Sequence, residues 1–248
     1  MKIRGLSVLA SILMTCGLAT PAAAGVSPYV RLAYGGSQFR MTDLNHGIQD
    51  DNAAFQDAGF PAAFEKTGSG YGPGASVGVW ITSGLRLGAT YSYLRAVRSN
   101  RFDTANPVDF AYSDELDLRM SEIGVEAAVR FRRLWGLTLG ASVAQGRGEI
   151  TEKLTVTQTV DVPDYYHFDG KAHRTKTTCG AFVGLDQTND AGVAGYIQAG
   201  FQYRDFGHMA GEMTETDGVD VVRSTGRTGW LDYSGFYVKV GVGYDFVH

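Results

Sequence analysis

Apolar and polar residues alternate most regularly near the end of the chain, over residues 235–246. Every second side chain there is apolar, with Phe236 at one end, Phe246 at the other and valines between them. The intervening positions are tyrosine, lysine, glycine and aspartate. Successive side chains of a strand point to opposite faces, so this segment predicts a β-strand with one apolar face. Aromatic residues at both ends of such a face are typical of a strand that crosses a bilayer.

The same alternation recurs in seven earlier segments, and long and short connections take turns between them. We expect strands at residues 29–34, 74–81, 85–93, 122–131, 137–144, 178–185 and 193–204. The long connections cover about 40–70, 98–113, 148–174 and 205–229. Outer-membrane barrels have an even number of strands, short periplasmic turns and long extracellular loops. The pattern therefore predicts an all-β fold, a closed antiparallel eight-stranded transmembrane β-barrel with four long extracellular loops and short periplasmic turns.

Two details of the pattern need an explanation. Leu116, Leu118 and Met120 have the opposite parity to the apolar residues that follow them, so we expect a bulge or a change of environment near Ser121. The third long connection contains a strand-like run at 154–160, which predicts a hairpin that continues the fifth and sixth strands.

Alternation alone does not say which face points inward. A soluble eight-stranded barrel, such as a lipocalin, would bury the apolar face. The apolar face of the predicted strands carries no charge, however, and the other face is mostly glycine, serine, threonine and alanine. Small residues suit the narrow interior of an eight-stranded barrel, so the pattern favours an apolar face turned to lipid.

The first 24 residues predict a signal peptide, and residues 25–248 then form one barrel domain. Lys2 and Arg4 precede an uncharged, largely apolar run, and Ala22-Ala23-Ala24 offers a cleavage site. The formal net charge is −4, and the signal removes only basic residues, so a nucleic-acid partner is not expected. Cys179 is the only cysteine after the signal, so we expect no internal disulfide.

Three segments carry a resemblance to a known family. These are residues 29–34 (YVRLAY), 74–79 (GASVGV) and 240–246 (VGVGYDF). In pattern the chain resembles the eight-stranded outer-membrane β-barrels of the OmpA-like and opacity-protein (porin-like) type. It departs from them at the end, where Val247 and His248 follow the aromatic Phe246. The resemblance implies an integral protein of the bacterial outer membrane with a structural or adhesin-like role, in contact with a host or surface ligand through its loops.

Charged residues gather on the face that we expect to line the lumen. An unpaired charge in a narrow barrel would be costly, so these residues should form a mutual hydrogen-bonded network that packs the interior. Glu126 and Arg130 lie on one face of one strand, within reach of the neighbouring strands. The alternative is a proton or ion path, that is, a narrow pore for small solutes. The predicted lumen network consists of Arg31, Arg86, Glu122, Glu126, Arg130, Arg204, Lys239 and Asp245.

An enzyme is the second class considered, because barrels that modify lipid A or cleave proteins have a similar outline. Such an enzyme needs a histidine with a serine or carboxylate partner near the outer rim. His46, His167, His173 and His208 all fall in predicted loops. We therefore expect no catalytic residue, no cofactor and no metal site.

The first long connection holds the candidates for interaction with a partner. Its acids include Asp50 and Asp51, which could bind divalent cations that bridge to lipopolysaccharide phosphates, or a basic partner. Its phenylalanines Phe55, Phe60 and Phe64 should either pack or bind something, because exposed rings are unfavourable in water. The expected partners are outer-membrane lipid, lipopolysaccharide and a surface ligand, and the protein is expected to be a monomer.

Overall fold

The computed structural model of the protein describes residues 26–57, 59, 64–104, 109–160, 162–218 and 220–246. The expected signal peptide, Phe60 and the Val247-His248 extension lie outside the described residues. The elements in chain order are β1 (Ser27–Gln38), α2 (Thr42–Asp57), β2 (Ser69–Trp80), β3 (Leu85–Thr104), β4 (Asp109–Phe131), the 3-10 turn η1 (Arg132–Leu134), β5 (Leu137–Val160), β6 (Val162–Thr188), β7 (Val193–Tyr203), β8 (Asp205–Asp217), β9 (Asp220–Asp232) and β10 (Gly235–Asp245).

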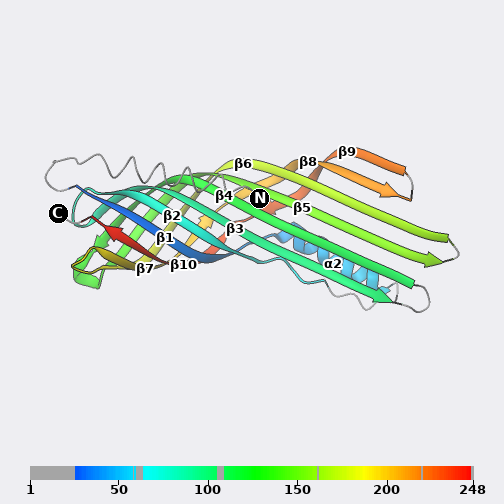
Figure 1. Cartoon of the computed structure of the whole chain (residues 1–248), viewed down its shortest axis with the longest axis horizontal. Helices are drawn as coiled ribbons and strands as arrows, with labels where there is room; N and C mark the ends of the chain where they lie inside the picture. The colour runs from blue at the N-terminus through cyan, green and yellow to red at the C-terminus, as the bar shows by residue number, and fades with distance from the viewer. Residues whose placement is uncertain are drawn as a thin grey trace.

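Eight of these strands close a ring in the order β1-β2-β3-β4-β5-β6-β7-β10, with β10 returning to β1 (Figure 1). All pairs in the ring are antiparallel. The first and last strands form the closing pair, in which Tyr29 lies opposite Asp245 and Ser37 opposite Tyr237. The predicted closed antiparallel ring of eight strands is therefore confirmed.

The wall of the ring is much taller on one side. Strands β1, β2, β7 and β10 have 11 or 12 residues, whereas β3, β4, β5 and β6 have 20 to 27. Beyond the ring these four strands continue as a sheet, β8 pairs with the protruding part of β6, and β9 pairs with β8. The result is an open six-stranded sheet, β3-β4-β5-β6-β8-β9, which we call the protruding sheet.

The protruding sheet confirms one prediction about the connections and corrects two. The hairpin expected to continue the fifth and sixth strands is present in β5 and β6. Residues 205–229, expected as a loop, belong instead to the hairpin of β8 and β9, and much of 98–113 lies in β3 and β4. Both faces of β8 are rich in polar residues, because this hairpin stands outside the bilayer, and a search for an apolar stripe overlooks such strands.

The first long connection contains a helix, α2, which the alternation pattern did not predict. Leu44 and Ile48 are one helical turn apart and form an apolar stripe in a polar segment. Backbone hydrogen bonds fix the start of the helix to the base of β9, from Met41 N to Asp232 O (3.1 Å) and from Arg40 N to Ser234 O (3.1 Å). Within the described residues, no helix is long and apolar enough to cross a membrane.

Two apolar clusters lie between α2 and the inner face of the protruding sheet. The larger, which we call the plug core, contains Phe39, Met41, Leu94, Ala96, Leu116, Leu118, Met120, Ile150, Ala172, Phe206, Met209, Leu231 and Tyr233. The smaller contains Ile48, Phe64 and Tyr112, with partly buried Phe55 and Phe102 packed against them. Leu44 contacts both clusters, so α2 covers the open end of the ring with apolar side chains.

The plug core explains the parity change in β4. The register of β4 with β3 and β5 runs without a shift through Ser121, so the first of the two expected explanations, a bulge near Ser121, is wrong. Leu116, Leu118 and Met120 are each 1% exposed and face the inside, as Glu122 does. The environment of the inner face changes instead, from a polar lumen to an apolar core.

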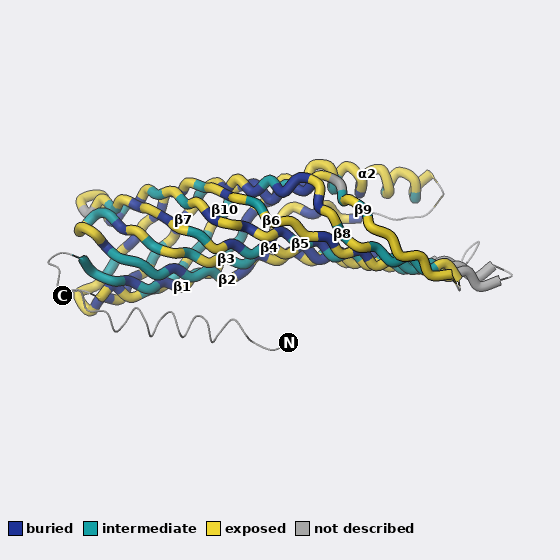
Figure 2. Tube along the Cα trace, turned by 90° about the horizontal axis from the view of Figure 1, so that it is seen from above, coloured by how far each residue is buried: buried dark blue, intermediate teal, exposed yellow. Residues whose placement is uncertain are grey.

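The outer face of the ring is a belt of exposed apolar side chains. Figure 2 shows exposed positions recurring along the strands of the ring, between buried and intermediate ones. It includes Leu32, Leu87, Ile123, Val125, Val129, Leu139, Val143, Val183, Leu185, Val193, Ile197, Phe201, Phe236, Val238, Val240, Val242 and Tyr244. A continuous apolar surface of this kind marks contact with a membrane. The belt ends where charged residues appear on the outer faces of β3, β4 and β5, with Arg95 opposite Arg119 and Arg119 opposite Glu149.

Candidate functional site

The predicted lumen charges fall into two groups, one at each end of the ring interior. The group near the short turns, here the lower cluster, contains three arginines and three carboxylates from β1, β3, β4, β6 and β10. Its members are Arg31, Arg86, Arg130, Glu126, Asp186 and Asp245, and all but Arg130 are at most 5% exposed.

Asp186 is the centre of the lower cluster. It accepts hydrogen bonds from Arg31 Nη1 and from Arg86 Nη1, the latter at 2.8 Å. Arg31 reaches Asp245 Oδ1 with its other terminal nitrogen at 3.3 Å, and Arg130 Nη1 lies 3.7 Å from Asp245 Oδ2. Each arginine therefore faces two carboxylates, which is the arrangement that a buried charge needs.

Sequence reasoning missed Asp186, although a signal for it was present. The predicted sixth strand ended at Leu185, whereas β6 continues to Thr188. Thr178 and Phe182 face inward on this strand, and the same parity places Asp186 inward. Extending the strand by a single residue would have added the central carboxylate to the predicted network.

The cluster near the protruding sheet, here the upper cluster, is built around Glu122 and Arg204. Arg204 donates from Nη2 to Glu122 Oε2 (2.8 Å) and from Nε to Glu122 Oε1 (3.1 Å), which makes a two-pronged pair. Thr178 and Ser92 donate to the two carboxylate oxygens of Glu122 at 2.7 and 3.0 Å. Every oxygen of the buried carboxylate thus has at least two donors.

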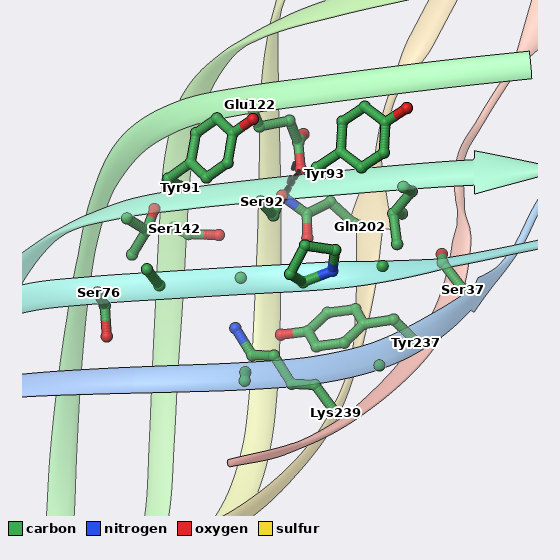
Figure 3. A pocket seen from close by; sticks show the side chains of 18 of the residues that line it. Ser37, Ser76, Tyr91, Ser92, Tyr93, Glu122, Ser142, Gln202, Tyr237 and Lys239 are labelled. Atoms are coloured by element: carbon green, nitrogen blue, oxygen red, sulfur yellow. Dashed lines mark hydrogen bonds between the residues drawn. The ribbon is translucent and has the colours of Figure 1, made fainter. Parts of the chain in front are cut away.

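A cavity of about 80 Å³ separates the two clusters, and Lys239 lies in its wall (Figure 3). The Lys239 Nζ is 5.5 Å from the centre of the Tyr237 ring, and both side chains point into the cavity (Figure 3). Among the described residues no carboxylate forms an ion pair with Lys239 within 4.0 Å. Serines 76 and 142 also line this space, together with small apolar residues such as Ala33 and Ala75, so its wall is mixed.

The plug core fills the interior directly above the upper cluster. A methyl group placed at Gly146 would lie 3.3 Å from the Phe206 ring and 3.5 Å from Glu122 Cγ, so the ring and the carboxylate are neighbours. Phe206 and Met209 are both 0% exposed. The lumen is therefore covered by packed apolar side chains on the side of the protruding sheet.

The structure brings seven of the eight predicted lumen residues into ion pairs, and Lys239 is the exception. Glu126 and Arg130, which were expected within reach of the neighbouring strands, both belong to the lower cluster. Glu126 lies 3.3 Å from Arg86, whereas Arg130 turns toward Asp186 and Asp245 and donates to Thr188 at 3.2 Å. The guanidinium of Arg130 also stacks on Trp80, 4.0 Å from the ring centre.

The predicted loop residues lie on and beside α2. Phe55 and Phe64 pack edge to face with ring centres 5.4 Å apart, and Phe64 stacks on Tyr112 at 5.0 Å. These rings therefore contribute to the smaller apolar cluster. Asp50 and Asp51 are exposed on the helix.

The histidines that the enzyme alternative would need are scattered. His167 shares a hydrogen bond with Thr155 Oγ1 (3.0 Å), and His208 bonds the carbonyl oxygen of Thr228 (2.8 Å). His46 lies on α2, and His173 lies on the exposed face of β6. In the described part of the chain, no group of three histidine, cysteine, aspartate or glutamate side chains could hold a metal ion.

Comparison with known proteins found similar structures but no similar sequences. No protein-family model and no curated protein matches the chain. The solved structure of Ail, the attachment invasion locus protein of Yersinia pestis, in complex with the heparin analogue sucrose octasulfate, is 10% identical, with a TM-score of 0.44 over 90% of this chain and 99% of that one.

Two further structures also match the chain. A major outer membrane protein from Thermus thermophilus is 11% identical, with a TM-score of 0.43 over 88% of this chain and 99% of that one. The outer membrane protein AlkL is 14% identical, with a TM-score of 0.36 over 93% and 95%. These values carry no information on function. The closed ring, its apolar belt and its charged interior are those of an integral β-barrel of the bacterial outer membrane.

Proposed function

We propose that this protein is an adhesin-like surface barrel that binds an extracellular partner along the free edge of β9. The observation that carries this proposal is the order of the protruding sheet, in which β9 is the last strand. An edge strand presents unpaired N–H and C=O groups, to which an extended segment of another protein can add as a further strand.

The side chains of β9 suit such a contact. Val221 and Val222 are each 58% exposed and Trp230 is 43% exposed, so the edge offers apolar surface beside its backbone groups. The hairpin of β8 and β9 stands on the tall side of the ring, away from the belt (Figure 1). A partner in the external medium can therefore approach it without meeting lipid.

The interior supports a closed scaffold rather than a pore. The plug core covers the lumen on one side, and the lower cluster binds three arginines to three carboxylates on the other. The scattered histidines favour a protein that is not an enzyme. We accordingly keep a monomeric, non-catalytic barrel as the proposal.

Lipopolysaccharide is the second partner that we propose. Arg95, Arg119 and Arg147 lie on adjacent strands just above the belt, and each side chain is 46 to 49% exposed. Guanidinium groups bind phosphate directly and in a forked geometry. These arginines would bind lipid phosphates directly, whereas the acids of α2 would need bridging cations to do so.

The test uses bacteria that carry the protein on their surface and an epithelial cell monolayer. The variant Val221→Lys/Val222→Lys places charges on the β9 edge, and Val97→Lys on the exposed outer face of β3 is the matched control. We expect adhesion above that of bacteria without the protein, its loss in the β9 variant and its retention in the control. Equal adhesion of the β9 variant and the wild type would refute the proposed site.

A further inference from the structure

A cleft of about 360 Å³ lies between α2 and the inner face of the protruding sheet. Its floor is made of the small residues Ala172, Gly211 and Gly226, which are neighbours in register across β6, β8 and β9. Because these positions have little or no side chain, α2 spans the cleft without filling it. Small-molecule sites commonly have volumes of about 300–1,000 Å³.

The walls of the cleft are apolar along its length. Ile48 of α2 and Ile150 of β5 are buried in the two apolar clusters and face the cleft. Phe168 and Met213 complete the wall on the side of β6 and β8. A ligand in the cleft would therefore bury an apolar body.

Charged residues also line the cleft, with one more carboxylate than cation. The carboxylates are those of Asp43, Asp51, Glu152 and Glu212, and the cations are Arg98, Lys171 and Arg227. Arg98 is already bonded to Asp114, which does not line the cleft. Asp51 and Glu152 make no ion pair with the described residues within 4.0 Å, although each lies near Arg98. Asp114 is 3% exposed, and its Oδ1 has no hydrogen-bond partner among the described residues.

Burial and neighbouring carboxylates disfavour the charged form of these acids. Burial raises the pKa of Glu152, and the nearby Asp114 carboxylate raises it further against the opposing effect of Arg98. Burial also raises the pKa of Asp51, which Arg98 lowers and Asp114 raises. A bound positive charge would reverse these shifts.

We propose that this cleft binds a small amphiphilic cation, an organic amine whose ammonium group pairs with Glu152 and Asp51 and whose apolar body lies along Ile48, Ile150 and Met213. An organic cation fits better than a metal ion, because the described acids form no group of three with the spacing of metal ligands. The site is separate from the β9 edge and does not depend on the proposed adhesion.

The experiment is calorimetric titration of the full-length protein in lipid nanodiscs with 4-phenylbutylamine. Its neutral counterpart 4-phenylbutan-1-ol and calcium chloride are titrated in parallel. The variants are Glu152→Gln, Asp51→Asn and Gly226→Ala, and Glu115→Gln is the matched control because Glu115 is exposed on the opposite face of β4. A Cβ at Gly226 would add bulk to the lining of the cleft and displace the flexible end of Met213, 2.0 Å away.

We expect the amine to bind the wild type and the alcohol to bind at least about tenfold more weakly, because only the amine forms charge-assisted hydrogen bonds. Glu152→Gln and Asp51→Asn should each weaken amine binding about tenfold, Gly226→Ala should weaken it, and Glu115→Gln should leave it unchanged. Retained heat-modifiable migration on gels shows that each variant is folded. No amine binding to the wild type, equal binding of amine and alcohol, wild-type affinity in Glu152→Gln, or displacement of the amine by calcium would each overturn the proposal.

Discussion

Asp186→Asn should be the most damaging single substitution in the lumen. The side chain keeps its size but loses the charge that accepts hydrogen bonds from Arg31 and Arg86. The lower cluster would change from three cations and three anions to three cations and two anions. Leaving an uncompensated buried charge typically costs about 3–5 kcal/mol.

The lower end of that range applies, because the two arginines keep other partners. Arg31 retains Asp245 at 3.3 Å, and Arg86 retains Glu126 at 3.3 Å. A loss of about 3 kcal/mol, with a urea dependence of about 2 kcal/mol per molar, lowers the unfolding midpoint by about 1.5 M. The assay is urea unfolding of the protein in lipid vesicles, followed by tryptophan fluorescence, since the buried Trp80 stacks against Arg130.

Two further variants make the test specific. Asp190→Asn removes an exposed carboxylate from the turn that follows β6 and should leave the midpoint unchanged. Adding Arg31→Gln to Asp186→Asn restores equal numbers of cations and anions and should recover part of the loss. If Asp186→Asn and Asp190→Asn unfold at the same urea concentration, the lower cluster does not hold the barrel together.

Three other predictions address the belt, the outer surface and the lumen. Val240→Arg on the belt should destabilise the barrel in bilayers by about 2–4 kcal/mol, whereas Val221→Arg on β9 should not; equal stability of the two variants would contradict the assigned membrane face. Burial opposes ionisation of Asp117, but hydrogen bonds from Arg95 and Arg119 outweigh it and lower its pKa. The contribution of this carboxylate to stability is therefore fully present above its ordinary pKa of about 4, and it is lost as the pH falls through the lower pKa of the folded state. It amounts to about 1 kcal/mol or less, because both arginines are half exposed. Asp117→Asn should accordingly flatten urea stability between pH 6 and pH 3, and an unchanged slope would speak against the pair. In planar bilayers the wild type should show no steady single-channel conductance, because the plug core covers the lumen, and a large steady conductance would support the pore alternative.

The eight-stranded ring could be predicted because lipid on one side and a narrow lumen on the other impose a strict two-residue period. That period did not predict the elements that lie outside the membrane. The helix α2 rests on Leu44 and Ile48 within a polar segment, and its stability comes from contact with the plug core, which is a tertiary effect. The strands β8 and β9 have no lipid-facing side, so their alternation is weak.

Prediction from the sequence was limited in a similar way within the lumen. Parity assigns a residue to the inner face, but it does not say which inner residues meet across the ring. Arg31 and Asp186 are 155 positions apart, and their contact depends on how far each strand is shifted along its neighbour. The same shift places Glu126 beside Arg86 and Arg130 beside Asp245.

The closing pair of the ring has a consequence for the order of folding. Most pairs in the barrel join strands that follow one another in the chain, but the β1–β10 pair joins residues 29–37 to 237–245. Hairpins such as β3–β4 and β5–β6 can form early, whereas the last hydrogen-bonded seam must wait for the most distant contact. Until that seam forms, β1 and β10 are exposed edges that could pair with other chains. The Arg31–Asp245 contact lies across this seam, so it becomes available only when the barrel closes.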